Sequence, residues 1–430
     1  MIIIERIKKA LRSIWFYPAV YGLISLLGAF FIILIDTRYL TQFHNSVPEI
    51  LLTSTELARD IHGIIASAFI TITTFTFSTT MVVLTMYMSQ LSPRVVENFL
   101  KNKNTMQSFG IFVGGFIYSI VSLLFTRNTS EGYLVISASV GVVYIAVGLV
   151  YFLLFINSVA TFIQTSNVID RLHKESVLKI KKYKGTLKDN PIIKEIDKEK
   201  YRNNKAIRSI ESGYIQKLNY NELSSIANNK KLIIHFEKVI GQFINRDEKI
   251  FTIYSQESLE DKEELLDKIK KLIIIGNRKT EEQDFSYTIQ KIVEVALRAI
   301  SPGINDPNTA THCIRIIGVL LGMLSNIDDG YIVVNEDKES EGLVLLEAYS
   351  FKMILHDAFT QIVHYGHADI TVVVAIIRAL KYVSFKSKKD NKKIIKDYVE
   401  FIYRKTKSED LDQFELEIID MEMDSYYKYS

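Results

Sequence analysis

The sequence predicts a membrane protein in which a four-helix transmembrane domain is followed by a cytoplasmic α+β region. Two segments, 61–93 and 132–169, contain no Asp, Glu, Lys or Arg, and each is longer than the roughly 20 residues that cross a bilayer core. Beyond residue 170 charged residues are frequent, as in a soluble domain. The overall composition, 48% hydrophobic and 23% charged, therefore averages two regions of different character.

The first region, residues 1–170, is expected to contain four spans. Its basic start leads into an apolar run that is longer than the ~7–15 residue core of a secretory signal, and no clear cleavage site follows. We therefore expect this run to be retained as the first span. The expected spans cover residues 14–35, 61–91, 109–125 and 134–163.

The distribution of basic residues predicts the orientation of these spans. Lys and Arg are concentrated before the first span, between the second and third, and after the fourth. The opposite loops supply only Arg38, Arg59 and Arg127. Because short loops rich in Lys and Arg stay on the cytoplasmic side, both termini are predicted to be cytoplasmic, in a protein of the inner (plasma) membrane.

Hydroxyl side chains form a stripe along the second span. At about 100° per residue, six Ser and Thr residues fall within a narrow arc of one helix. Either they line a hydrated path, or they allow two helices to approach closely and hydrogen-bond. The six residues are Ser67, Thr71, Thr74, Ser78, Thr85 and Ser89.

The third and fourth spans contain small residues four positions apart, such as Gly110 and Gly114, which let helix backbones pack closely. Neither apolar run contains an acidic or basic residue. This argues against an ion-coupled carrier, which normally buries such a group within the membrane. A neutral pore in a homo-oligomer, or no pore at all, is compatible with these spans.

The second region begins with a lysine-rich connector at 171–205. It either contacts anionic lipid headgroups or is a solvated linker. At 206–256, short apolar runs between turn residues predict a small β-barrel. At 257–430, apolar residues recur every three or four positions, which predicts a helical domain.

Acidic residues of the helical domain are candidates for a divalent metal site. Asp284, Glu294 and Asp306, with Arg298 and Asn305, could hold a cation or a polar ligand. Alternatively, these residues connect two helices to the turn between them. In that turn Pro302 and Gly303 would end one helix and Asp306 would cap the next. The turn motif comprises Ser301, Pro302, Gly303, Asn305, Asp306 and Pro307.

A second cluster of metal-ligand residue types lies at 356–369. His364 and His367 are three positions apart, a spacing that can suit zinc, but Gly366 would interrupt the helix between them. Surface or capping roles are the simpler interpretation. The cluster comprises His356, Asp357, His364, His367 and Asp369.

Motifs for catalysis are missing from the sequence. It contains no phosphate-binding glycine loop, no Gly-x-Ser-x-Gly elbow and no nucleophilic Cys/His pair. The net charge of +3 is too small to indicate nucleic-acid binding. No cofactor is expected, and an enzymatic role is disfavoured.

Four stretches, in order along residues 10–385, carry a resemblance to a known family. They are Ser89–Arg94 with Asn98–Leu100, Ser212–Gln216, Gln283–Pro307, and Ala358–Gly366. With these stretches the sequence resembles the bacterial predicted-membrane-protein family known as domain of unknown function 2254. Where that family usually has Arg-Pro-Gly-Asp-Phe-Val, this chain has Lys238-Val-Ile-Gly-Gln-Phe-Ile244 and lacks the acidic residue. The resemblance implies an integral membrane protein and no particular activity.

Three classes of function are compatible with these observations. The first is a homo-oligomeric channel or conduit lined by the second span and gated by the cytoplasmic region. The second is a non-transporting sensor or scaffold whose cytoplasmic region binds a ligand or partner. The third is a membrane-bound enzyme using Asp284–Asp306, which the missing catalytic motifs disfavour.

Overall fold

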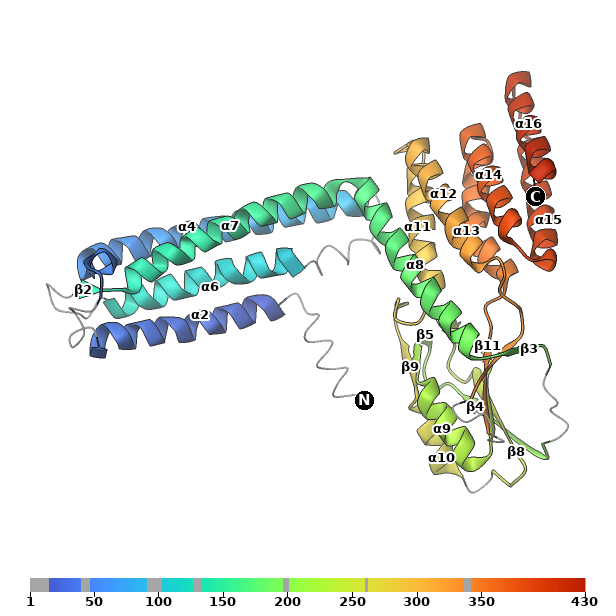
Figure 1. Ribbon diagram of the computed structural model, residues 1–430, viewed down its shortest axis with the longest axis horizontal. Coiled ribbons are helices and arrows are strands. Elements are labelled where there is room, and N and C mark those ends of the chain that lie inside the picture. Colours follow the sequence, from blue (N-terminus) through green and yellow to red (C-terminus); the bar gives the residue numbers. More distant parts are fainter. Residues whose placement is uncertain are drawn as a thin grey trace. The chain divides into compact units, whose positions relative to one another are not determined.

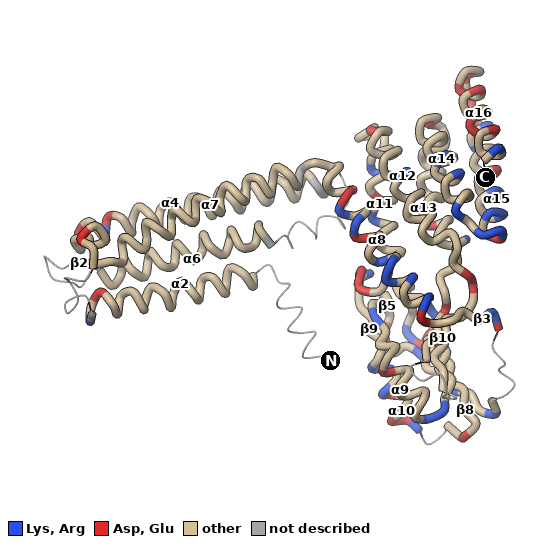
Figure 2. Tube along the Cα trace, viewed as in Figure 1, with Lys and Arg blue, Asp and Glu red and all other residues tan. Residues whose placement is uncertain are grey.

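The computed structural model describes residues 15–39, 47–90, 103–126, 134–195, 201–259, 262–335 and 342–429 (Figure 1). The chain divides into two compact units, Met1–Asn167 and Val168–Ser430. Charged residues are sparse along the long helices of the first unit and frequent in the second (Figure 2). The family-like residues 91–94 and 98–100 lie outside the described residues.

The first unit contains four helical segments that are long and apolar enough to cross a membrane, among the residues described: Phe16–Arg38, Thr55–Met86, Asn104–Thr126 and Ser137–Thr161. Each of the four expected spans overlaps one of these segments, with ends that differ by up to six residues. The elements of the unit are α2 (Phe16–Leu34), the π-helical turn η1 (Ile35–Tyr39), the 3-10 turn η3 (Glu49–Leu51), β1 (Thr53–Ser54), α4 (Thr55–Gln90), α6 (Lys103–Thr126), β2 (Leu134–Val135) and α7 (Ser137–Ile163). Strands β1 and β2 pair antiparallel where α4 and α7 begin.

One aromatic ring joins three of these helices. Phe69 of α4 is fully buried between Gly115 of α6 and Gly148 of α7. A Cβ atom on Gly148 would lie 2.6 Å from the Phe69 ring, and one on Gly115 would lie closer still. Only glycine therefore lets both backbones approach the ring, and this contact determines which side of α4 faces its neighbours.

Helix α6 also packs closely against α2. A Cβ atom on Gly110 would lie 2.7 Å from the Tyr21 ring, and one on Gly114 would lie 2.5 Å from the Ser25 hydroxyl. The Ser25 and Tyr144 hydroxyls are hydrogen-bonded at 2.8 Å. The small residues of the third span thus allow both close backbone approach and a hydrogen bond between α2 and α7.

A carboxylate from the first span caps the fourth. Asp36, in η1, accepts hydrogen bonds from the backbone N–H groups of Ile136 (2.8 Å) and Ser137 (3.2 Å) at the start of α7. Ile136 supplies no capping side chain of its own. The partial positive charge of the helix N-terminus favours a carboxylate there, so this buried acidic residue has a structural role.

The second unit contains two open sheets. Helix α8 (Thr165–Asp189) starts one residue after α7 ends and carries the chain into this unit. The larger sheet has the strand order β3 (Ile192–Ile193), β10 (Tyr331–Val334), β11 (Leu343–Glu347), β6 (Ile233–Phe236), β8 (Lys249–Ser255) and β4 (Asn203–Arg208). The smaller has the order β7 (Phe243–Ile244), β5 (Gly213–Leu218) and β9 (Ile273–Gly276).

No closed barrel is found in the part of the chain that the structure describes, so the barrel expected at 206–256 is not confirmed. Strands from this stretch belong to both sheets and pair with strands from outside it. In the larger sheet β6 pairs in parallel with β11, and in the smaller β5 pairs with β9. Alternation of apolar and polar residues within a segment predicts that the segment is a strand. It does not identify the strand with which that segment pairs, which can lie about 100 residues away.

The remaining elements are helical. Buried Ile289, Ile292, Val293 and Ala296 form the core-facing side of α11. A Cβ atom on Gly318 of α12 would lie 2.8 Å from the Cβ of Ala379 on α14, so these two helices pack closely. The helices are α9 (Tyr220–Lys230), α10 (Glu263–Lys270), α11 (Phe285–Ala299), α12 (Pro307–Leu324), α13 (Phe351–Gly366), α14 (Ile370–Lys386), α15 (Lys389–Thr406) and α16 (Gln413–Tyr429). The region expected to be helical therefore also contributes β9, β10 and β11.

The Phe69 contact predicts that a single methyl group disrupts the first unit. Gly148→Ala or Gly115→Ala should lower the melting temperature of the detergent-solubilised protein, because overpacking a tight contact costs about 1–3 kcal/mol. Gly28→Ala on α2 is the matched control, since no atom lies within 4 Å of its added Cβ. Equal melting temperatures for all three variants would contradict this packing.

Candidate functional site

The hydroxyl stripe of α4 lies on the side of the helix that the other described residues of the first unit do not cover. Ser67, Thr71, Thr74, Ser78 and Thr85 are all exposed. The opposite side, with Ile65, Phe69, Thr76 and Val83, is buried. The Ser89 side chain lies outside the described residues.

Four hydroxyl groups of this stripe make a hydrogen bond within their own helix. Ser67, Thr71, Thr74 and Thr85 each donate a hydrogen bond of 2.8–2.9 Å to the carbonyl four residues earlier. Each oxygen keeps lone pairs that can accept further hydrogen bonds from water or from a neighbouring helix. The stripe is therefore compatible with both interpretations of the sequence.

Apolar side chains border the stripe along both edges. Each of them has 45–69% of its surface exposed. They are Ile64, Phe75 and Val82 on one edge and Ile70, Phe77 and Met81 on the other. In a hydrated lumen these residues would contact neighbouring helices, and the hydroxyls between them would face the water.

Sequence reasoning missed a buried histidine in the first unit. His62 of α4 has no exposed surface, and its ring lies edge-on to Tyr118 with the centroids 5.9 Å apart. The segment 61–93 lacks Asp, Glu, Lys and Arg, but it contains this ionisable imidazole. A histidine inside a charge-free segment is the signal that would have identified it.

The structure does not bring the three candidate metal ligands together. Asp284 caps the start of α11, and Asp306 follows the end of the same helix. The 15 residues of α11 extend about 22 Å at 1.5 Å per residue. The described residues contain no group of three His, Cys, Asp or Glu side chains that could hold a metal ion.

Asp306 and its neighbours form the turn between α11 and α12. The Asp306 carboxylate accepts from the Thr309 backbone N–H at 3.1 Å, and Pro307 is the first residue of α12. The left-handed residue of the turn is Asn305, with φ of +50°, whereas Gly303 has no positive φ. In the same turn the Ser301 hydroxyl donates to the carbonyl of Arg298, and the Asn305 N–H donates to that of Ser301. Pro302 and Gly303 form the bend between these bonds.

The candidate histidines are dispersed. His367 contacts the Glu409 carboxylate at 2.9 Å, while Asp369 caps α14 through the Thr371 N–H at 2.8 Å. His356 packs against Tyr398. His364 is exposed near the end of α13.

A polar groove between α11 and α13 unites residues from both candidate clusters. Glu294 lines it together with His356 and Asp357, and burial raises the pKa of Asp357. The groove has a volume of about 490 Å³. Neither candidate cluster as a whole is assembled there.

Three sequence stretches that are distant along the chain meet at Asp284. Gly241, with φ of +86°, packs its Cα against the second carboxylate oxygen of Asp284, in the position that a Cβ would occupy. The Gly241 N–H donates to the Ile215 carbonyl at 2.8 Å. The neighbouring Gln283 bonds both backbone groups of Leu218, at 2.8 and 3.0 Å. Residues 212–216, 241 and 283–284 of the family-like pattern thus form one packed centre.

Asp284 is a buried helix cap in an unusual environment. It has no exposed surface and accepts from the Ser286 hydroxyl at 2.6 Å and the Tyr287 N–H at 3.1 Å. Burial raises its pKa above the ordinary 3.8, although these hydrogen bonds and the charge of Lys279 act in the opposite direction. The Tyr349 hydroxyl donates to the Ile240 carbonyl at 2.7 Å and lies 3.5 Å from Asp284.

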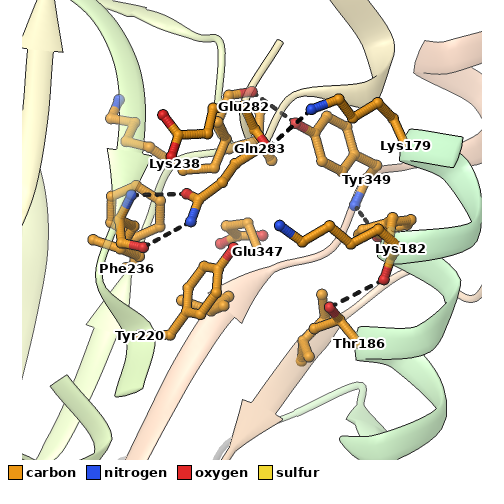
Figure 3. A pocket seen from close by; sticks show the side chains of 16 residues that line it. Lys179, Lys182, Thr186, Tyr220, Phe236, Lys238, Glu282, Gln283, Glu347 and Tyr349 are labelled. Atoms are coloured by element: carbon orange, nitrogen blue, oxygen red, sulfur yellow. Dashed lines mark hydrogen bonds between the residues drawn. The ribbon is translucent and has the colours of Figure 1, made fainter. Parts of the chain in front are cut away.

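A cavity of about 70 Å³ lies beside this centre (Figure 3). It lies between α8 on one side and strands β5, β6, β10 and β11 on the other, and it is partly open to solvent. Lysine and tyrosine side chains line it together with apolar residues of the sheet. Sequence reasoning missed this cavity because its walls come from six separate segments.

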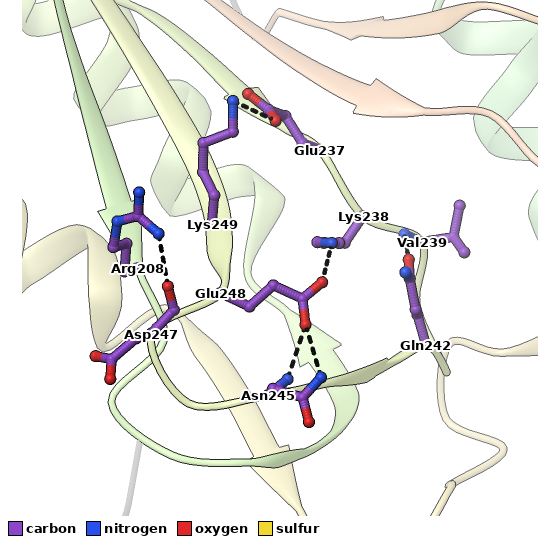
Figure 4. A network of polar contacts seen from close by, with 9 residues as sticks. All are labelled: Arg208, Glu237, Lys238, Val239, Gln242, Asn245, Asp247, Glu248 and Lys249. Carbon is purple, nitrogen blue, oxygen red and sulfur yellow. Dashed lines mark hydrogen bonds and ion pairs between the residues drawn. The ribbon is translucent and has the colours of Figure 1, made fainter.

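The segment that departs from the family pattern forms a turn beside the cavity (Figure 4). Lys238 pairs with Glu248, whose pKa is lowered by this contact and by the Asn245 N–H. Gln242, at the position of the missing acidic residue, is exposed and accepts from the Val239 N–H at 3.4 Å. The amide closes a local turn, and it lies outside the cavity lining.

Comparison with known proteins identifies the family. Residues 11–382 match the family described as predicted membrane protein (DUF2254). The chain belongs to this family. Uncharacterized proteins of Mycobacterium tuberculosis strain H37Rv and Mycobacterium bovis are each 22% identical to it over 346 residues, which cover 76% of this chain and 64% of the relative. The chain thus spans less than two thirds of the length of these curated relatives. No solved structure matches it.

The burial of Asp284 predicts a pH-dependent effect on stability. Because its pKa is raised, the folded protein holds this proton more tightly than the unfolded chain does. The contribution to stability is therefore present at low pH and is lost as the pH rises through the raised pKa. Asp284→Asn has no charge to bury. The melting temperature of this variant minus that of the unchanged protein should therefore be larger at pH 8 than at pH 5.

Asp284→Ala is the control for this prediction. It removes the buried charge as well, so its melting temperature relative to the unchanged protein should show the same pH dependence, but lowered at both pH values by the loss of the helix cap, which costs about 1 kcal/mol. An Asn variant that is destabilised as much as the Ala variant at pH 8 would show that the carboxylate charge itself stabilises the fold.

Proposed function

We propose that the protein is a homo-oligomeric membrane channel or conduit in which α4 helices from several copies line the path. The observation that carries this proposal is the exposed hydroxyl stripe opposite the Phe69 contact. Helix α4 uses its other side to pack against α6 and α7, so among the described residues of the first unit the stripe stays available to lipid, water or another copy.

A ring of α4 helices accounts for both kinds of side chain on the exposed side. The bordering apolar residues would pack between neighbouring copies, and the hydroxyls would face a neutral, hydrated lumen. The second unit would act as a cytoplasmic vestibule or gate. The lining would contain no full charge, because residues 61–93 lack Asp, Glu, Lys and Arg.

The proposal includes an inner-membrane location with both termini in the cytoplasm. Helix α8 has a basic side on which Lys174, Lys181 and Lys188 are exposed around Leu178, which is 67% exposed. Such a surface can contact anionic lipid headgroups while an apolar side chain reaches the membrane interface. This favours a lipid contact for the segment 171–205.

A non-transporting sensor is the second candidate function. It is favoured by the connection between α7 and α8, which are separated only by Gln164. Because α8 also lines the cavity in the second unit, a molecule bound there would contact the helix that continues from the fourth span.

Substitutions in the stripe test the conduit. Thr71→Val, Thr74→Val and Ser78→Val remove hydroxyls and should together lower the conductance in reconstituted bilayers, because an apolar constriction promotes dewetting. Thr73→Val is the matched control: its partly buried hydroxyl bonds the Phe69 carbonyl, away from the stripe. A different outcome would support a helix–helix contact instead. In that case the unchanged protein shows no measurable conductance, and the Val variants dissociate from their oligomers.

A charged substitution tests the same point more sharply. Thr74→Asp in a hydrated lumen should be tolerated and should favour cations, whereas in a dry contact it costs about 2.5–3.5 kcal/mol. A Thr74→Asp protein that assembles and conducts no ions under voltage or tension would contradict the conduit.

Cysteine labelling tests the orientation. The single cysteine of the chain, Cys313, is fully buried, so introduced thiols can be read against a low background. Ile50→Cys, at a position 90% exposed before α4, should react with an impermeant thiol reagent in intact cells, and Lys174→Cys should not. The reverse pattern would place the termini outside.

A further inference from the structure

We propose that the cavity between α8 and the larger sheet binds a small oxyanion, a phosphate or carboxylate, that carries a short apolar group. This inference names a ligand class for the sensor candidate and rests on the premise that the second unit binds a ligand. It does not depend on transport.

Three lysines line the cavity: Lys238 pairs with Glu248, Lys179 donates to the Glu282 carbonyl at 3.4 Å, and Lys182 remains. Glu282 and Glu347 line the cavity, but Glu282 pairs with Lys217 at 2.7 Å and Glu347 lies 3.4 Å from His235. Lys238 is neutralised by Glu248, outside the cavity. The Lys182 ammonium has no ion-pair partner among the described residues. Figure 3 shows it extending from α8 into the cavity, toward Tyr220 and Glu347.

Several polar groups of the cavity lining already have hydrogen-bond partners within the protein. The Gln283 amide is used by the Leu218 backbone, and the Tyr349 hydroxyl donates to the Ile240 carbonyl. The Tyr183 hydroxyl accepts from the Tyr349 N–H at 3.2 Å and so keeps its proton for another acceptor.

Tyr220 supplies a further donor. It opens α9, lines the cavity, and its hydroxyl makes no hydrogen bond within the part of the chain described. Burial raises the pKa of Tyr220 and of Tyr183 to about 12, so both phenols are protonated and able to donate near neutral pH. An ammonium group with two phenolic donors favours an anion and disfavours a metal ion.

The wall of the cavity opposite Lys182 is apolar and favours an apolar group on the ligand. Phe236, Ile332 and Leu346 present apolar side chains from three neighbouring strands. A volume of about 70 Å³ accommodates a headgroup and a short apolar part but is small for a nucleotide. Since Lys182 and Tyr183 belong to α8 and Tyr220 follows β5, a bound oxyanion would link α8 to the sheet.

The test uses the full chain in nanodiscs of neutral lipid, with inorganic phosphate and butyl phosphate as probes. Both should raise the melting temperature in a saturable manner, and butyl phosphate should bind more tightly because its alkyl group contacts the apolar wall. Lys182→Gln should weaken butyl phosphate binding about tenfold or more because it removes the positive charge, and Tyr220→Phe should weaken it several-fold because it removes a hydrogen bond to a charged ligand.

Lys181→Gln is the matched control, because Lys181 neighbours Lys182 on α8 and lies outside the cavity lining. It should leave binding unchanged. Absence of saturable binding by either probe would overturn the proposal, as would equal weakening by the two lysine substitutions, which would indicate attraction to the general basic surface. Because binding is measured directly, failure here would leave the conductance tests of the conduit unaffected.

The source of the oxyanion is tested by the lipid composition. Anionic lipid in the nanodisc would compete with butyl phosphate if the site accepts lipid headgroups. It should then weaken butyl phosphate binding to the unchanged protein and leave the residual binding of Lys182→Gln unchanged. If anionic lipid has no effect on binding, the ligand is a soluble anion. Both results uphold an oxyanion site at Lys182.

Discussion

The contact of the Phe69 ring with Gly115 and Gly148 is the constraint on which the first unit depends. It brings α4, α6 and α7 together at distances that only glycine permits. It also determines the rotation of α4 about its own axis. Once Phe69 faces inward, residues at half-turn offsets such as Thr71 and Thr74 must face outward. The hydroxyl stripe is therefore exposed as a consequence of core packing, and the proposed conduit follows from this geometry.

A comparable contact organises the second unit. Gly241 leaves room for the Asp284 carboxylate, and Asp284 in turn caps α11, which packs against α12 and α13. Burial of this carboxyl costs free energy, which its hydrogen bonds to Ser286 and Tyr287 partly offset. The adjoining cavity inherits its shape from the same contact, because Ile240 and Gln283, the neighbours of these two residues, form part of its lining.

Local sequence features predicted much of the architecture but little of the candidate sites. Charge-free segments identified the four apolar helices. The start of α12 at Pro307 was also predictable, because Asp306 is a residue type that caps a helix by accepting a hydrogen bond from the backbone N–H three residues later, here that of Thr309. The strand partners of β5 and β6 could not be read in this way. The metal hypothesis for Asp284, Glu294 and Asp306 grouped residues by proximity in sequence, yet a full helix separates the two aspartates.

The sequence by itself determined where the apolar helices lie, where helices are capped, and which side of α4 carries hydroxyls, because hydropathy, capping and periodicity depend on residues within a few positions of each other. Only the tertiary structure decided that this side is the uncovered one, that Gly241 meets Asp284, and that Lys182, Tyr183 and Tyr220 surround one cavity. These relations join residues about 40 to 100 positions apart. They arise from close packing of side chains and backbones, which local periodicity does not encode.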